Sequence, residues 1–257
     1  MIKTTEITDL ILGDKNNMKK IKLDRFQMKL FMALLMVLDH IAFFIPESLV
    51  LIFHVATRVV GVWFAYIAVE GFIYTSNLKK YIFRLFSSAA FMFVGNHLLT
   101  LLFKDRGIVV QNNIFLTLAI GVLMLTALTK IKSKMVGYPC IAVLLVAGVL
   151  IAEGGMTILP FMLITYLTYG KNKYRNIGYL CLSVILFLMS FVNYEDLITT
   201  IEMLAFNSDF MFIFVIPFLY MYNGKRGNNS KFAKYFFYVF YPAHLWIIAT
   251  IAYIVSK

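Results

Sequence analysis

The sequence predicts an all-α fold, a polytopic membrane helix bundle of about nine transmembrane helices, or ten if one amphipathic segment also crosses. The first reason is composition: 61% of the 257 residues are hydrophobic, 14% are charged, and the mean hydropathy is +0.82, far from the profile of a soluble domain. The second reason is length, because the apolar runs reach about 20 residues, enough to cross a hydrocarbon core of about 30 Å as helix. A transmembrane β-barrel is excluded, because its strands alternate apolar and polar residues.

The apolar runs define the elements in chain order. Nine spans are expected at 26–45, 51–75, 82–103, 113–129, 135–152, 155–170, 176–193, 210–223 and 233–255, with boundaries good to about 2–4 residues. Residues 195–209 carry an amphipathic stripe between acidic flanks, which predicts an interfacial helix on the outer face, the alternative being a tenth span. No loop is long enough for a soluble domain. The expected organisation is therefore a cytoplasmic N-terminal tail over residues 1–23 and one transmembrane domain over 24–257.

The basic residues predict the orientation of the bundle. If the N-terminus is cytoplasmic, all but four of the 24 Lys and Arg residues fall in inner segments. The exceptions are Lys104, Arg106 and Lys257 in outer segments and Arg58 within a span. Because cytoplasmic loops are enriched in Lys and Arg, this pattern predicts a multi-pass protein of the cytoplasmic (inner) membrane. Topology thus accounts for the net charge of +11, so nucleic acid is not an expected partner.

Several common chemical motifs are missing from the sequence. No Walker loop, dinucleotide fingerprint, HExxH motif or zinc-ligand spacing occurs, so no metal is expected. The two cysteines, Cys140 and Cys181, lie in apolar runs and are expected to be free, buried thiols.

Ionisable residues inside the apolar runs are the main functional signal. An Asp, Arg or Lys at the centre of a membrane helix costs roughly 2.5–3.5 kcal/mol on insertion scales, so a cluster of them needs a compensating reason. A helix rise of about 1.5 Å per residue places His40, Arg58 and His97 in an outer layer, roughly 8–10 Å below the outer surface. Asn113 and Glu153, at the outer ends of their spans, can join this layer.

A second, inner layer contains Lys29 and Glu70. Lys29 and His40 are eleven residues apart, which returns nearly to the same helix face about 16 Å further along. Asp39 points about 100° away from His40. Matching depths predict that Arg58 pairs with Asp39 and Glu70 with Lys29, because an unpaired membrane charge is the costly alternative.

Each of these residues has a structural interpretation beside the functional one. His40 is either an interior polar residue or a general base, and either Glu153 or a backbone carbonyl orients it. Arg58 either stabilises an oxyanion or neutralises Asp39. His244 follows Tyr241-Pro242, so it could satisfy the backbone carbonyl that the proline leaves free.

In order and spacing, these residues resemble the TraX family, membrane proteins known for N-acetylating conjugative pilin within a wider superfamily of integral-membrane acyltransferases. The resemblance covers nearly the whole chain after the tail. The matching pieces, in order, are Lys29 with Asp39-His40, Arg58 with Glu70-Gly71-Phe72, Tyr74-Thr75-Ser76-Asn77, Lys80-Tyr81, Arg84-Leu85, Asn113-Ile114-Phe115 with Gly121, Glu153-Gly154, and Tyr241-Pro242-Ala243-His244-Leu245. Two departures are Gly61-Val62, where the family usually has Phe-Pro, and Glu153, where Asp is common.

The resemblance implies an integral-membrane acetyl- or acyltransferase. Its donor is cytoplasmic acetyl-CoA, and its acceptor is an amine or hydroxyl of a peptide, glycan or other molecule at the outer face, for example a pilin-like peptide N-terminus. The catalytic residues expected on this basis are His40, Asp39, Arg58 and Glu153. The residues expected to bind the donor are Lys29, Glu70, Lys80, Arg84 and His244. His97 and Asn113 are expected on the acceptor side.

Two other functions compete with this one. In a transporter or channel, the same buried Asp, His, Arg and Glu would form an ion or proton relay, although the sequence lacks an internal repeat and paired broken spans. An assembly factor could keep the fold without the chemistry.

Overall fold

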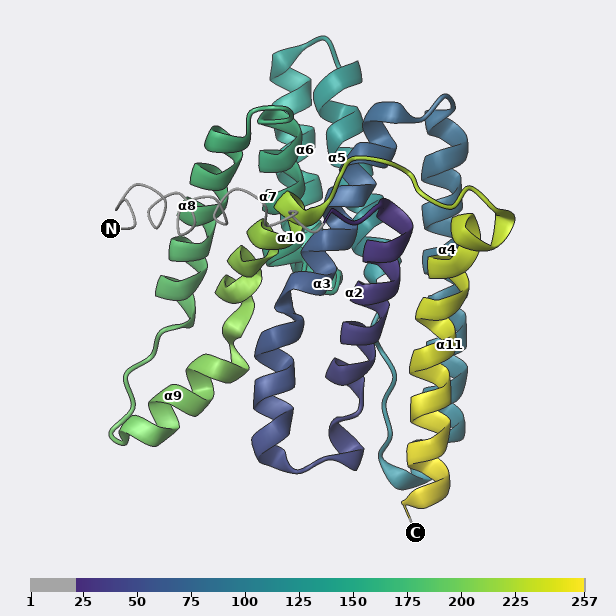
Figure 1. Ribbon diagram of the computed structural model, residues 1–257, viewed down its shortest axis with the longest axis vertical. Helices are drawn as coiled ribbons and strands as arrows, with labels where there is room; N and C mark the ends of the chain where they lie inside the picture. Colours follow the sequence, from purple (N-terminus) through teal and green to yellow (C-terminus); the bar gives the residue numbers. More distant parts are fainter. Residues whose placement is uncertain (1–21, 257) are drawn as a thin grey trace, which may run out of the picture.

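The computed structural model describes residues 22–256, and this part of the chain is helical (Figure 1). Within residues 22–256 there is no strand, only an isolated bridge between Leu23 and Tyr222. The α-helices are α2 (Arg25–His40), α3 (Glu47–Tyr74), α4 (Leu78–Leu102), α5 (Ile114–Lys130), α6 (Lys134–Ile151), α7 (Gly155–Leu167), α8 (Asn172–Ser190), α9 (Leu197–Phe206), α10 (Val215–Met221) and α11 (Lys231–Val255). Short 3₁₀ segments are η1 (Ala42–Phe44), η2 (Lys104–Arg106) and η3 (Ser208–Phe214). The all-α prediction is confirmed for the described residues.

Local sequence sets where several helices begin. At the start of α2, Asp24 accepts hydrogen bonds from the backbone N–H groups of Phe26 and Gln27, and the Gln27 side chain accepts one from the Asp24 N–H, which completes a capping box. The residues before four other helices also cap them with a side-chain oxygen: Asn77, Asn113, Asp196 and Ser230. Each cap satisfies backbone donors that the first helical turn leaves free.

Helix α3 is central in the bundle and packs against α2, α5, α7, α9, α10 and η3. In Figure 1, α4 and α11 run side by side along one edge and α8 runs along the other. The core around α3 is apolar and tightly filled, with Trp63, Met32 and Phe115 buried beside it. This packing fixes the polar residues of α2 and α3 relative to each other.

Four helices are long and apolar enough to cross a membrane: α3, α4, α6 and α11. A fifth candidate exists if α9 and the segment Ser208–Met221, bent by 61°, are counted as one broken span. Helix α2 has 16 residues, which corresponds to about 24 Å of helix, less than the hydrocarbon thickness of about 30 Å. These apolar helices indicate a membrane protein, while the count of nine spans and the side of the N-terminus remain predictions.

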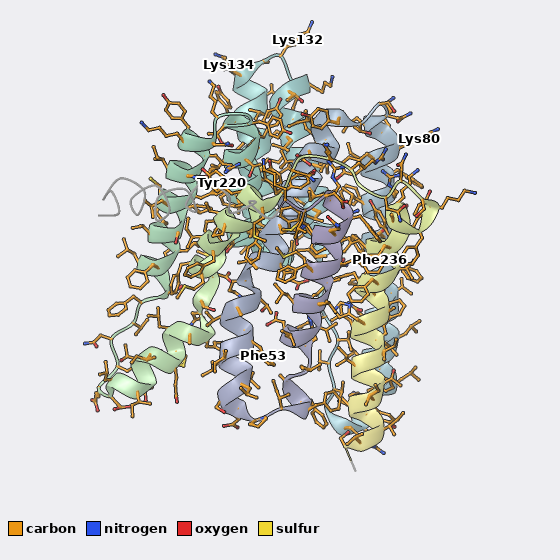
Figure 2. All side chains as sticks on the ribbon, in the orientation of Figure 1. Phe53, Lys80, Lys132, Lys134, Tyr220 and Phe236 are labelled. Carbon is orange, nitrogen blue, oxygen red and sulfur yellow. The ribbon has the colours of Figure 1, made fainter. Side chains whose placement is uncertain are left out.

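The surface supports the membrane assignment. Large apolar side chains are exposed along the outward faces of several helices, for example Phe83, Phe93 and Leu188 at 74%, 69% and 68%. Such surfaces are unfavourable in water and ordinary in lipid. Figure 2 shows Lys132 and Lys134 at the upper end of the molecule and Lys80 close to that end. These three lysines, all assigned to inner loops, therefore lie toward one end of the bundle.

The predicted span at 210–223 is wrong as a single helix. The chain there is the 3₁₀ segment Ser208–Phe214 followed by only seven residues of α10. The amphipathic segment at 195–209 is helical as expected, as α9. In Figure 1, α9 lies across the direction of its neighbours.

Two other predictions concern the tail and the thiols. Residues 1–21 of the predicted tail, and Lys257, lie outside the described residues; Leu23 bonds to the backbone of Met221 and Asn223. Cys140 and Cys181 are free as expected, but Cys181 is exposed and Cys140 half-buried. Neither thiol belongs to the buried core.

Candidate functional site

Two cavities lie along α2 and α3. The larger one, of about 600 Å³, is lined by Arg25, Lys29, Glu70, Arg84, Arg226 and Lys234, among others, and is called here the basic cavity. The smaller one, of about 240 Å³, is lined by Asp39, His40, Arg58, Glu153, Asp209 and Tyr241, among others, and is called the histidine cavity. The two-layer arrangement predicted from helix rise is thus present as two separate cavities.

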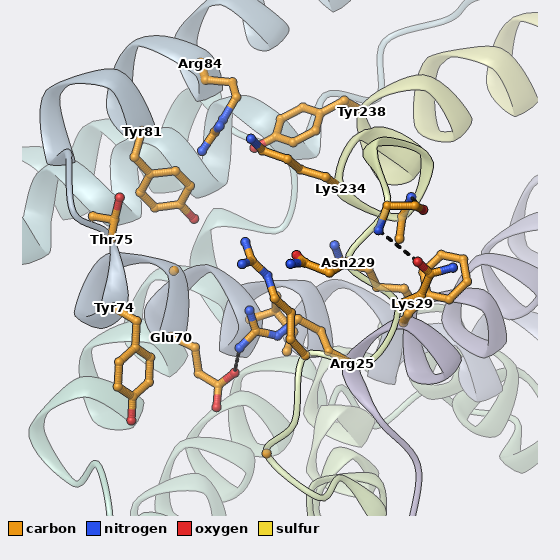
Figure 3. A pocket seen from close by; sticks show the side chains of 18 of the residues that line it. Arg25, Lys29, Glu70, Tyr74, Thr75, Tyr81, Arg84, Asn229, Lys234 and Tyr238 are labelled. Atoms are coloured by element: carbon orange, nitrogen blue, oxygen red, sulfur yellow. Dashed lines mark hydrogen bonds and ion pairs between the residues drawn. The ribbon is translucent and has the colours of Figure 1, made fainter.

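The basic cavity has a strong excess of positive charge. Five cationic side chains line it, against the single carboxylate of Glu70. In Figure 3 the charged ends of Arg84, from α4, and Lys234, from α11, approach each other across the cavity. Arg84 also lies over the rings of Tyr81 and Tyr238. Clustered cations beside aromatic rings suit a ligand that carries both phosphates and a planar base.

Glu70 is only 4% exposed, and Arg25 rather than Lys29 neutralises it. Arg25 Nη2 donates to Glu70 Oε2 at 2.6 Å, and the hydroxyl of Tyr222 donates to the same oxygen at 3.0 Å. The predicted Glu70–Lys29 pair is therefore wrong. Arg25 occupies the first turn of α2 and is the cation whose side chain reaches the inner end of α3, which leaves Lys29 free to face a ligand in the basic cavity.

In the histidine cavity, Arg58 bridges two acids from different elements. Its Nη2 lies 2.9 Å from Asp39 Oδ2 on α2, and its Nη1 lies 3.3 Å from Asp209 Oδ1 in η3. Its Nε donates to the backbone carbonyl of His54, and Nη2 also lies 3.3 Å from the Nδ1 atom of His54. The predicted Asp39–Arg58 pair is confirmed. Because a guanidinium has five N–H groups, these contacts leave one of them, on Nη1, without a partner among the described residues.

His54 and Asp209 are members of this cluster that the sequence analysis did not select. His54 Nδ1 lies 3.3 Å from Asp39 Oδ1, and its Nε2 donates to the backbone carbonyl of Phe206 at 2.9 Å. Asp209 also accepts a hydrogen bond from Thr157 at 3.1 Å. His54 precedes Arg58 by one helical turn, a spacing that puts both on one face of α3. That spacing was the signal available in the sequence.

His40 is oriented by a backbone carbonyl. Its Nδ1 lies 2.8 Å from the carbonyl oxygen of Met36, one turn earlier in α2. Because a carbonyl oxygen only accepts hydrogen bonds, the neutral ring carries its proton on Nδ1 and presents a lone pair on Nε2. Of the two orienting groups considered from the sequence, Glu153 and a carbonyl, the carbonyl is the one bonded.

Glu153 sits in the turn between α6 and α7, where Gly154 adopts a left-handed conformation with φ of 61°. Its carboxylate accepts from the hydroxyl of Tyr241 and from the side-chain amide of Asn112, each at 2.9 Å. The Tyr241 hydroxyl also accepts from the backbone N–H of Ile114. Glu153 is thus held in place by α11 and by the residue next to Asn113.

Four residues assigned from the sequence lie elsewhere than expected. His97 is exposed, stacks on Phe93 and lines neither cavity. Asn113 caps α5 and donates to the carbonyl of Ala89. Lys80 is exposed on the first turn of α4, outside the basic cavity. The depth of a residue along its helix was predictable, whereas the face it presents was not.

The fourth residue that lies elsewhere than expected is His244. It does not line the basic cavity but packs beside His40, with the two ring centroids 5.1 Å apart and the ring planes at 81°. It therefore belongs to the region of the histidine cavity rather than to a donor-binding site at the opposite end of the bundle.

A buried apolar layer separates the two cavities. The rings of Phe64 and Phe237 stack at a centroid distance of 3.8 Å, and Met32 of α2 is fully buried. Phe237 lies one turn from Lys234, which lines the basic cavity, and one turn from Tyr241, which lines the histidine cavity. We refer to Met32, Phe64 and Phe237 as the apolar layer.

No metal-binding group of three or more His, Cys, Asp or Glu side chains occurs in residues 22–256.

Comparison with known proteins gives one family. The family model described as TraX protein matches residues 24–252. No curated protein matches the chain, and no solved structure matches it. The match includes both cavities and all ten described α-helices except the last three residues of α11. The chain therefore belongs to the TraX family.

Proposed function

We propose that this protein is an integral-membrane acyltransferase that takes an acetyl group from cytoplasmic acetyl-CoA and transfers it to an amine or hydroxyl acceptor on the outer face. The observation that carries the proposal is the pair of cavities on α2 and α3. One cavity is rich in cations. The other contains an oriented histidine together with two carboxylates, each paired with Arg58. A donor with several phosphates matches the first, and proton transfer matches the second.

The donor would bind with its phosphates among Lys29, Arg84, Arg226 and Lys234 and its adenine against the tyrosine rings. Lys29 and His40 lie on one stripe of α2, about 16 Å apart along the axis. The extended pantetheine arm of coenzyme A is comparable in length. To bring the thioester to His40, the arm has to pass the apolar layer, so Phe64 and Phe237 move apart when the donor binds.

In the reaction, the acceptor nitrogen or oxygen attacks the thioester carbonyl carbon, and its proton passes to Nε2 of His40. The remaining N–H of Arg58 lies in the same cavity and would donate to the oxyanion of the tetrahedral intermediate. The carbon–sulfur bond then breaks, and the proton on His40 is returned to the departing thiolate. Asp39 and Asp209 hold Arg58 in place, and Glu153 contributes a fixed negative charge near the acceptor. A pilin-like peptide N-terminus is one acceptor of the right chemistry.

The test is acetyl transfer by purified protein in lipid nanodiscs, supplied with acetyl-CoA labelled on the acetyl group. We expect the wild-type protein to transfer the label to an added amine or to hydrolyse the thioester. His40→Ala should lower the rate by roughly 10²- to 10⁴-fold, the usual contribution of a general base, while acetyl-CoA binding stays intact. His97→Ala is the matched control, because His97 is a histidine that lines neither cavity.

Full transfer activity in the His40→Ala variant would show that His40 takes no part in the reaction. A wild-type protein that binds no acetyl-CoA and turns over none would contradict the acyltransferase proposal itself. In that case, proton flux into liposomes distinguishes an ion relay from an assembly factor without chemistry.

A further inference from the structure

His244 has a buried nitrogen without a partner. The side chain is on α11 and is 6% exposed. Its Nδ1 donates to the backbone carbonyl of Phe240 at 3.0 Å, and its ring stacks on that of Phe240. Its Nε2 has no hydrogen-bond partner among the described residues. Leaving a buried polar atom unpaired costs about 1–3 kcal/mol, so this nitrogen calls for an explanation.

The neighbouring proline does not supply that explanation. Pro242 lacks an N–H group, and the carbonyl it leaves without a helical donor is that of Tyr238, four residues earlier. The carbonyl to which His244 donates belongs to Phe240. His244 therefore does not repair the proline defect, which was the structural interpretation open from the sequence.

The nearest ionisable side chain whose ring faces His244 is His40. The two rings are 5.1 Å apart between centroids and nearly perpendicular. In both residues Nδ1 donates to the carbonyl four residues earlier in the same helix. Both neutral rings therefore have their lone pair on Nε2. Two lone pairs cannot bond to each other, and the two nitrogens are not hydrogen-bonded to each other in this structure. A proton added to one ring makes its Nε2 a donor, and a rotation of the packed rings would bring the other Nε2 to it as the acceptor of an N–H···N hydrogen bond.

The other charged groups around the histidines have contacts of their own. Asp39 and Asp209 contact Arg58, Asp39 Oδ1 lies 3.3 Å from His54 Nδ1 but accepts no hydrogen bond among the described residues, and Glu153 accepts from Tyr241. Tyr241 has its ring 5.6 Å from that of His244, but its hydroxyl is committed to Glu153 and to a backbone N–H. Asp39 Oδ1 and Nε2 of His244 are both acceptors without a hydrogen bond among the described residues, and of these it is His244 whose ring packs against that of His40.

We propose that His244 is a positioning residue that shares the catalytic proton with His40. This inference rests on the proposed function. When the acceptor attacks the thioester, the proton leaves the acceptor and binds Nε2 of His40. That N–H then donates to the lone pair on Nε2 of His244 until the carbon–sulfur bond breaks and the thiolate takes the proton. No bond to His244 other than this hydrogen bond forms or breaks.

The pair can be tested without any activity measurement, because the chain contains only four histidines. Protein labelled with ¹⁵N-histidine in nanodiscs gives few ring signals, which the variants His40→Asn and His244→Asn assign. We expect the Nε2 signals of His40 and His244 to shift together at one midpoint as the pH is lowered. In His244→Asn, the midpoint of His40 should change, whereas His97→Asn should leave it unchanged. Independent midpoints, with that of His40 unaffected by His244→Asn, would overturn the proposal.

Kinetics then test the role of the pair. An asparagine at position 244 can still donate to the carbonyl of Phe240, whereas glutamine also places an oxygen near the position of Nε2. We expect His244→Asn to lower kcat by roughly tenfold or more, less than the loss from removing the base itself, with KM for acetyl-CoA unchanged. His244→Gln should retain more of the activity.

The two proposals fail in different ways. If the wild-type protein transfers acetyl groups and His244→Asn keeps its kcat, the proton-sharing role is wrong and the acyltransferase proposal stands. If the wild-type protein transfers nothing, the proposed function fails, and the ¹⁵N signals still decide whether the two histidines share a proton.

Discussion

Arg58 joins three parts of the chain through one side chain. It contacts Asp39 on α2, Asp209 in η3 and the backbone of its own helix at His54. A lysine at this position would keep the charge but not the planar fork that reaches two carboxylates at once. The residue thus determines both the electrostatics of the histidine cavity and the position of the segment that follows α9.

The Arg58 cluster predicts a stability effect separate from activity. Arg58→Gln leaves Asp39 and Asp209 without their cation and should cost about 3 kcal/mol, the lower end of the range for a broken buried pair, because both Arg58 and Asp39 are about one-fifth exposed. Thermal unfolding of the purified protein in detergent measures this loss of stability, with the surface variant Lys132→Gln as control.

Adding Asp39→Asn to Arg58→Gln provides the internal check on this prediction. The double variant should be less destabilised than the sum of the single variants, because the two residues interact directly. Additive losses would show that the pair contributes no coupling to stability.

At the scale of elements, α4 and α11 are in close contact where a glycine faces a tryptophan. A Cβ atom at Gly95 would collide with the indole ring of Trp246, whose Nε1 donates to Asn96 at 2.8 Å. Gly137 in α6 is different, because a Cβ there would meet Ile131 only at an ordinary contact distance of 3.7 Å. Both glycines are helical, so alanine would improve the helix propensity of each by about 1 kcal/mol.

This contrast predicts opposite outcomes for one substitution. Gly95→Ala should destabilise the protein by roughly 1–3 kcal/mol, the cost of overpacking, because the rigid indole has to move and its bond to Asn96 weakens. Gly137→Ala should be neutral or slightly stabilising. Unfolding temperatures of the two variants in the same detergent measure the difference; equal shifts would mean that α4 and α11 separate freely at this point.

At the scale of the whole molecule, the cavities lie toward opposite ends of α2 and α3, so their accessibility depends on the orientation of the bundle. The distribution of Lys and Arg predicts that the basic cavity faces the cytoplasm. That orientation is what a cytoplasmic acyl-CoA donor and an external acceptor require.

Single cysteines test the orientation. On a background with Cys140 and Cys181 replaced by alanine, we expect an impermeant maleimide to label Glu47→Cys and Glu195→Cys in intact cells. Lys132→Cys and Lys173→Cys should react only after permeabilisation. All four positions are exposed. The reverse labelling pattern would show that the bundle has the opposite orientation in the membrane. The donor and acceptor sides would then be exchanged.

The sequence predicted the parts of this architecture that depend on helix period and depth. It identified most of the helices, though not the break within 210–223, and the two polar layers. It also identified the Asp39–Arg58 pair, because two opposite charges at matching depth on adjacent helices have few other partners. It also placed Asp39 and His40 on different faces, and they bind different partners.

What the sequence could not supply were contacts that depend on helix rotation and on breaks in helices. Glu70 had several cations within reach at the inner end of the bundle, and only the packing of α2 on α3 selects Arg25 over Lys29. Asp209 reaches Arg58 because the chain turns by 61° after α9, a bend that the continuous apolar run through 210–223 concealed. His97 and Asn96 differ by one residue, and only the latter points inward.

The apolar layer of Met32, Phe64 and Phe237 has a consequence for the energetics of the membrane around the protein. Two water-filled hollows opening at opposite ends of a thin bundle would, if joined, let protons run down the membrane potential, each charge releasing about 2.3 kcal/mol per 100 mV. A dry aromatic contact between the hollows prevents this leak. The apolar layer therefore keeps the two cavities from forming one continuous path for protons.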